Sequence, residues 1–159
     1  MKPTMTPCLW FDNNAEDAMN FYRSVFSDFE VISVIPRPAA APGGPGGILA
    51  MTVRMNGQEI FALNGGPNYA LTPAISMFLT CETQAEVDRY WDALSAGGSV
   101  QQCGWLTDRY GLSWQVVPAG VTEMLRDPDG EKANRVITAV MSMVKLDLAR
   151  LKQAYAGEV

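Results

Sequence analysis

The sequence contains no histidine. Imidazole is the most frequent metal ligand, and it is the usual base in Ser-His and Cys-His nucleophilic sites and in acid-base catalysis. Its absence removes the usual residue from most familiar enzyme chemistry. We expect the protein to hold neither a metal nor another cofactor.

Basic residues are also scarce: the chain has 12 Lys and Arg against 17 Asp and Glu, a net charge of −5. This balance argues against nucleic acid or an anionic membrane as a partner. No charged-then-apolar leader opens the chain, and no apolar stretch approaches the roughly 20 residues needed to span a bilayer. Cys8, Cys81 and Cys103 are widely spaced and odd in number, so we expect buried reduced thiols and a cytoplasmic protein.

What the sequence does have is a near-repetition. An apolar run at 8–12 precedes a helical pattern with the aromatic pair Phe21-Tyr22, and a run at 77–82 precedes a similar pattern with Tyr90-Trp91. Two copies of a unit too small to bury its own apolar face must pack against each other. We expect a ligand in the concave surface between them.

The first copy begins with a strand and an amphipathic helix capped by Asn13 or Asn14. Asn56-Gly57 between two apolar runs is a strong signal for a tight hairpin. The predicted elements are a strand at 6–12, a helix at 15–26 and strands at 29–35, 48–55 and 58–64.

Residues 36–47 are rich in Pro and Gly, so they sustain neither a helix nor a strand ladder. This loop is either a flap over a site or a solvated connection.

The second copy repeats the order. Thr83 and Glu86 form a capping box. The predicted elements are a strand at 74–81, a helix at 84–96 and strands near 99–103, 105–108 and 112–117. The fold class is therefore α+β, with two βαβββ modules at 5–64 and 74–118 that together form one domain, 1–118.

Residues 119–159 have no counterpart in the first copy, and we predict a helical extension. Asp127-Pro128 supplies a cap and a first-turn proline. The helix carries an apolar stripe that must bury against the sheet or a second subunit; its members are Ala133, Val136, Ile137, Val140, Met141 and Val144.

Three segments, 9–22, 57–67 and 102–118, resemble the PhnB-like proteins, which often carry a demethylubiquinone methyltransferase label. These belong to the vicinal oxygen chelate superfamily, with glyoxalase I, the bleomycin-resistance proteins and the extradiol dioxygenases. The resemblance extends over nearly the whole chain, terminal helices included. It implies two βαβββ modules whose sheets curl into a cup. No predicted strand leads into a glycine-rich turn of the sort that cradles S-adenosylmethionine.

In the superfamily's enzymes the metal ligands come from the first strand of each module and from the last strand. By resemblance these positions fall near Pro7 or Cys8, on Ser76 and on Gln115. A proline or thiol, a hydroxyl and an amide are a poor set for a divalent cation. At these positions the sequence departs from the superfamily's metal-binding enzymes, and this departure predicts that no metal is held.

The same positions can still bind an organic molecule. Trp10, Trp105 and Trp114 lie on or beside strands, where they either line a cavity or fill the core. Gln115 faces the cup unless the register differs. Glu59 is either a general base or a solvated charge on a strand. The candidate ligand-binding residues are Cys8, Trp10, Ser76, Trp105, Trp114 and Gln115.

Two functions remain open. The first is a metal-free protein that binds a small apolar or aromatic molecule, and the second is a small lyase, isomerase or dioxygenase-like enzyme using Glu59, Gln115 or Cys8. The missing histidine favours the first. Because sheet edges and a methionine-bearing stripe remain to be covered, we also expect a symmetric homodimer.

Overall fold

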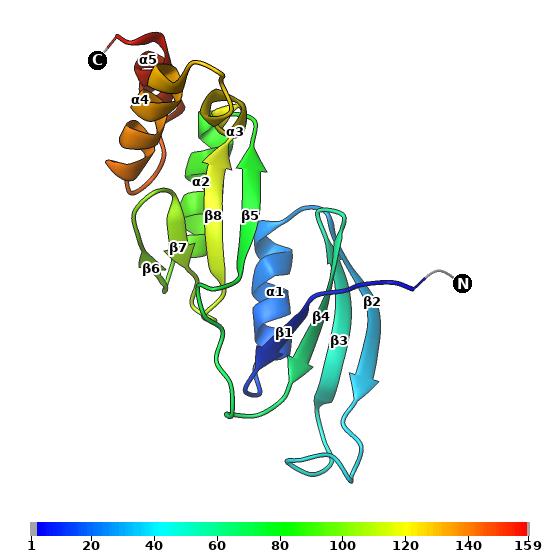
Figure 1. Ribbon diagram of the computed structural model, residues 1–159. Helices are drawn as coiled ribbons and strands as arrows, with labels where there is room; N and C mark the ends of the chain where they lie inside the picture. Colours follow the sequence, from blue (N-terminus) through cyan, green and yellow to red (C-terminus); the bar gives the residue numbers. More distant parts are fainter. Residues whose placement is uncertain (1–2, 159) are drawn as a thin grey trace. The chain divides into compact units, whose positions relative to one another are not determined.

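In the computed structural model, which describes residues 3–158, the chain forms two compact units, residues 1–71 and 72–159 (Figure 1). Each unit contains one four-stranded sheet. The two sheets share one topology, with the first strand of the unit parallel to the last and the remaining neighbours antiparallel. The predicted α+β fold with two βαβββ modules is confirmed.

The first unit holds the sheet β1-β4-β3-β2. Its elements are β1 (Cys8–Phe11), α1 (Ala15–Val25), β2 (Phe29–Pro36), β3 (Ile48–Met55) and β4 (Gln58–Asn64). Asn56 and Gly57, which form the β3–β4 turn, have φ angles of 46° and 78°, as the hairpin signal predicts.

One face of this sheet is covered by α1. The helix buries Ala15, Ala18, Met19 and Tyr22, and the strands alternate so that residues such as Leu9 and Ile60 are also buried. The intervening positions, which point to the other face, have no helix of their own unit above them. A unit with one helix can cover one face only.

The start of α1 is fixed by a residue from the far end of the unit. Asn14 occupies the cap position, but its side chain makes no capping hydrogen bond. Instead Asn64 Oδ1 accepts from the Ala15 backbone N–H at 2.9 Å, and Asn64 Nδ2 donates to the Ile48 carbonyl at 3.2 Å. This buried amide joins α1, β3 and β4.

The second unit holds the sheet β5-β8-β7-β6. Its elements are β5 (Ser76–Cys81), α2 (Gln84–Ser95), β6 (Ser99–Val100), β7 (Trp105–Thr107), β8 (Ser113–Pro118), α3 (Val121–Leu125), α4 (Gly130–Met141) and α5 (Leu148–Ala156). The capping box is confirmed in part: Thr83 Oγ1 accepts from the Glu86 N–H at 3.2 Å, while the Glu86 carboxylate accepts from the Glu82 N–H.

The predicted strand near 99–103 ends early, at Val100. Cys103 and Gly104 have φ angles of 65° and 78°, which a strand cannot contain. Their backbone N–H groups donate instead to the carbonyls of Met143 and Val144, at 2.7 and 2.8 Å. The C-terminal extension thus supplies the acceptor for the Cys103 N–H group, which the prediction placed in a strand.

Asp108, which ends the strand predicted at 105–108, is buried with 3% of its surface exposed. Its carboxylate accepts hydrogen bonds from the N–H groups of Tyr110 and Leu112 and from the Trp114 indole, at 2.8, 3.1 and 2.8 Å. The carboxylate therefore shapes the β7–β8 connection from inside.

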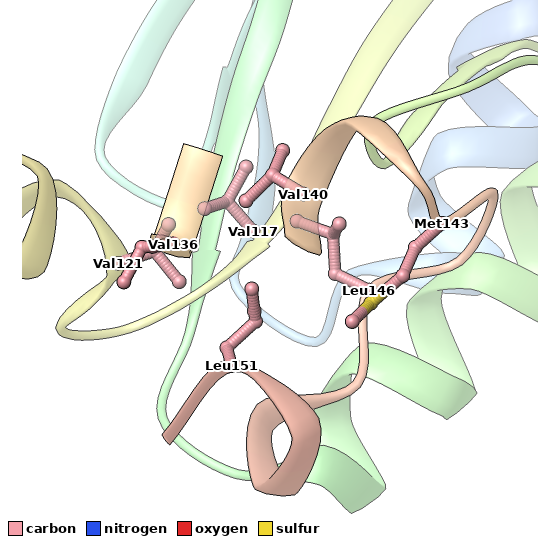
Figure 2. Packing of buried hydrophobic residues seen from close by; sticks show 7 residues of the cluster. All are labelled: Val117, Val121, Val136, Val140, Met143, Leu146 and Leu151. Carbon is pink, nitrogen blue, oxygen red and sulfur yellow. The ribbon is translucent and has the colours of Figure 1, made fainter. Parts of the chain in front are cut away.

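The C-terminal helices share a core with the end of β8 (Figure 2). It consists of Val117, Val121, Val136, Val140, Met143, Leu146 and Leu151. The cap of α4 is Asp129, not Asp127, because Asp129 Oδ1 accepts from the Glu131 N–H whereas Asp127 binds the Tyr155 hydroxyl. The short helix α3 was not predicted.

The predicted stripe on α4 is only partly buried. Val136 and Val140 lie in the core, whereas Ile137, Met141 and Val144 are exposed. Among residues 3–158, no helix combines the length and apolar character needed to cross a membrane.

Candidate functional site

The face of the second sheet opposite α2 carries three predicted site residues. Trp105 lies directly opposite Gln115 in the β7–β8 ladder, so their side chains share a face. Gln115 Nε2 donates a hydrogen bond to Ser76 Oγ at 3.0 Å, across the β5–β8 pair. The structure therefore brings Ser76, Trp105 and Gln115 together.

Trp114 lies on the opposite face of the same sheet. It pairs with Leu106, and both side chains are almost fully buried beneath α2, which contacts β7 and β8. The indole Nε1 is taken by Asp108. Because side chains alternate along a strand, Trp114 and its neighbour Gln115 point to opposite faces. Trp114 therefore does not belong with Ser76, Trp105 and Gln115.

The first sheet carries the other three candidates, Cys8, Trp10 and Glu59, on its own uncovered face. Cys8 pairs with Phe61 and Trp10 with Leu63 in the β1–β4 ladder. Cys8 was expected to be buried but is exposed.

Glu59 is already engaged by a cation. Its carboxylate accepts from Arg54 Nη2 at 2.8 Å, and Arg54 Nη1 reaches Glu30 at 2.5 Å. All three groups are largely solvent-exposed. This is the arrangement of a solvated charge cluster on a strand, in which each pair contributes little to stability.

The positions at which superfamily enzymes hold metal do not fit a cation here. Ser76 and Gln115 are neutral and bound to each other. Although Cys8 is exposed, partial desolvation by its neighbours raises the pKa of its thiol, which disfavours the thiolate that binds metal. Within residues 3–158, no three His, Cys, Asp or Glu side chains cluster closely enough to hold a metal ion.

The first unit also contains a cavity of about 580 Å³ where β1 and β4 end. Trp10 and Leu63 contribute apolar surface, and Asn64 and the turn that follows it form another part. Arg37 and Gly43 come from the 36–47 loop, so this loop supplies part of the cavity wall. Of the predicted site residues, only Trp10 lines this cavity.

Trp10 is held in a fixed position. Its indole Nε1 donates to the Gly66 carbonyl at 2.8 Å, and its ring meets Tyr69 edge-on with 5.0 Å between centroids. A Cβ atom on Gly65 would overlap the indole. The Gly65-Gly66 pair is the surface on which the ring rests.

Arg37 was missed by sequence reasoning. It lies in a Pro- and Gly-rich loop that has no periodic pattern. The one available signal was that Arg37 is the only charged residue in 36–47.

The match with known proteins extends from near the start of the chain to β8. The sequence profile of a family described as 3-demethylubiquinone-9 3-methyltransferase matches residues 3–117. The chain belongs to this family. A PhnB protein from Bacillus cereus, named as a candidate member of the same methyltransferase class, is 35% identical with a TM-score of 0.67. The match covers 74% of this chain and 100% of the Bacillus protein.

Two further solved structures share the fold. Protein PA1353 from Pseudomonas aeruginosa is 23% identical with a TM-score of 0.61, over 74% of this chain and 98% of its own. The fosfomycin resistance protein FosX from Listeria monocytogenes is 14% identical with a TM-score of 0.58, over 79% and 98%. These two likenesses show the shared fold. Membership of the vicinal oxygen chelate superfamily follows from the family profile and the Bacillus PhnB protein. No curated protein matches the chain.

The expected extent of the resemblance was wrong at one end. The family profile stops at residue 117, and the Bacillus protein is matched over its full length without accounting for the rest of this chain. Helices α3, α4 and α5 therefore lie outside the matched family region.

The family's description names a methyl transfer, which in most enzymes uses S-adenosylmethionine. A glycine-rich turn between a strand and a helix often holds such a cofactor. Here the β1–α1 turn is Asp12-Asn13-Asn14 and the β5–α2 turn is Glu82-Thr83, with no glycine in either. These turns do not fit that cofactor.

Gly65→Ala should destabilise the first unit, because the new methyl group would displace the Trp10 ring from its support. We expect a loss of about 1–3 kcal/mol of unfolding free energy and a red shift of tryptophan emission. Urea titration followed by fluorescence measures both.

The matched control is Gly130→Ala in α4, where a Cβ would meet no atom within 4 Å. It should not lower stability, since alanine favours a helix over glycine. Equal stability of Gly65→Ala and wild type would show that the ring does not depend on Gly65.

Proposed function

We propose that this protein binds a small apolar or aromatic molecule and holds no metal. Superfamily membership makes a ligand-binding or catalytic role on the sheet faces the starting expectation. What distinguishes this chain is the chemistry of the superfamily's metal-ligand positions.

The observation that carries the proposal is the hydrogen bond between Gln115 Nε2 and Ser76 Oγ. Two groups at these positions satisfy each other and bring no negative charge. An amide and a hydroxyl beside Trp105 form a surface with directional hydrogen bonding next to an aromatic ring. Such a combination suits an organic ligand better than a divalent cation.

The catalytic alternative is less well supported. A general base at Glu59 would first have to leave Arg54, and the raised pKa of Cys8 disfavours the thiolate needed of a nucleophile. We therefore favour binding over a lyase, isomerase or dioxygenase-like reaction.

Three free cysteines and the absence of any expected membrane or nucleic-acid partner support a cytoplasmic location.

The first test is metal content. Protein purified without added metal should carry far less than one equivalent of zinc, nickel, manganese or iron by elemental analysis. A chelator should leave the melting temperature unchanged, because removal of a ligand lowers stability only when that ligand binds the folded state. One tightly held metal ion per chain would overturn the proposal.

The second test is Gln115→Leu. Leucine has a similar volume but no polar group, so the substitution should alter the preference among polar ligands by roughly 1–3 kcal/mol while the fold is retained. A screen of small aromatic compounds, monitored by tryptophan fluorescence, measures the preference.

Gln101→Leu is the control for this test, because Gln101 is an exposed amide that donates to Ser99 and Thr107 in the same unit. It should leave ligand preference unchanged. If Gln115→Leu raises stability by about 1 kcal/mol or more and no compound quenches fluorescence, the site is vestigial.

We further propose a symmetric homodimer. The edge strand β2 exposes Val31, Ile32, Val34 and Ile35, and α4 exposes Met141. Apolar edges of this kind commonly mark interfaces.

Light scattering at micromolar concentration should give twice the monomer mass. Of the variants Val34→Lys and Met141→Lys, the one that yields a monomer identifies the interface. A monomeric wild-type protein would contradict the proposal.

A further inference from the structure

Arg37 is set apart from the other described cationic side chains by a buried guanidinium nitrogen that has no hydrogen-bond partner. Its two hydrogen bonds are both made by Nη2, to Asn13 Oδ1 at 2.6 Å and to the Ile48 carbonyl at 3.4 Å. Its Nε is buried and has no partner among residues 3–158, and no ion pair joins its guanidinium to a carboxylate in that range. Both partners of Arg37 are neutral.

A buried guanidinium N–H without an acceptor is costly, and its natural acceptor is a carboxylate or another oxyanion. By contrast Arg54, on the same sheet, contacts Glu30 and Glu59. The difference shows which arginine has donors left for a ligand.

Arg37 lies in the wall of the 580 Å³ cavity described above, a volume within the range of small-molecule sites. Gly43 approaches its Nη1 so closely that a Cβ there would lie 3.0 Å away. Gly43 of the loop thus packs close to the guanidinium. Other parts of the cavity wall are formed by Trp10 and Leu63.

The lining also limits the charge of an occupant. Arg37 is the single cation of the lining and the exposed Asp12 the single anion, so the wall is neutral overall. Because the lining offers one cation, it pairs with one anionic group, and a second anionic group on the ligand would find no further cation there. An apolar body would cover Trp10.

We propose that this cavity binds a small aromatic monocarboxylate, with the carboxylate on Arg37 and the ring against Trp10 and Leu63. This inference rests on the proposed function for the idea of an organic ligand, but it places that ligand on different residues. The Ser76–Gln115 pair belongs to the other unit and has no part in it.

The test compares benzoate, its neutral isostere benzamide and the dianion phenyl phosphate by calorimetry. Benzoate should bind at least about tenfold more tightly than benzamide, since a charge-assisted bond to guanidinium is lost in the amide. Phenyl phosphate should also bind more tightly than benzamide, because its oxyanion likewise pairs with the guanidinium. This comparison uses unmodified protein, so it does not depend on any variant folding.

Arg37→Gln should weaken benzoate binding about 10- to 100-fold and leave benzamide binding unchanged. Arg37→Lys should restore part of the loss, because it keeps the charge without the guanidinium fork. Arg54→Gln is the matched control and should have no effect on benzoate. Trp10→Phe should abolish the fluorescence change that benzoate produces.

Equal affinity for benzoate and benzamide, no binding of any of the three, or unchanged benzoate affinity in Arg37→Gln would overturn the inference. If aromatic ligands respond to Gln115→Leu but not to Arg37→Gln, the proposed function stands and this site falls. If a stoichiometric metal is found while the Arg37 dependence holds, the proposed function falls and this site stands.

Discussion

The structure depends on one constraint: in each unit the helix that follows the first strand packs against one of the two faces of the sheet. In the first unit α1 fills one face and fixes which side chains of β1, β3 and β4 are buried. In the second unit α2 does the same for β5, β7 and β8. The candidate site residues Cys8, Trp10, Ser76 and Gln115 lie on the faces opposite these helices.

The alternation of side chains between the two faces of a strand could be predicted from sequence, because it depends only on the spacing of residues along the chain. The position of Gln115 between Trp114 and Val116 already assigned it to the opposite face from both. The same reasoning could not decide which face was the covered one for each tryptophan. It grouped Trp114 with Gln115, although the buried Asp108 carboxylate holds Trp114 beneath the helix.

The failures share a cause, which is competition from residues distant in sequence. Asp127 looked like a helix cap, but Tyr155 takes its carboxylate and the cap moves to Asp129. The strand predicted at 99–103 loses its last residues to the backbone of Met143 and Val144. Arg37 is the strongest instance. It matters because its Nε is buried without a hydrogen-bond partner, and no local sequence pattern predicts such an unpaired group.

The two copies diverge most informatively at a single equivalent position. Asn64 ends β4 opposite Phe11, and Pro118 ends β8 opposite Cys81; in each copy the next backbone N–H donates to that opposite residue. After Asn64 the chain turns through two glycines beside a hollow, whereas after Pro118 it enters three helices that fill the corresponding region with a core. The same strand ending is therefore compatible with two different continuations, an open cavity in the first unit and a packed helical core in the second.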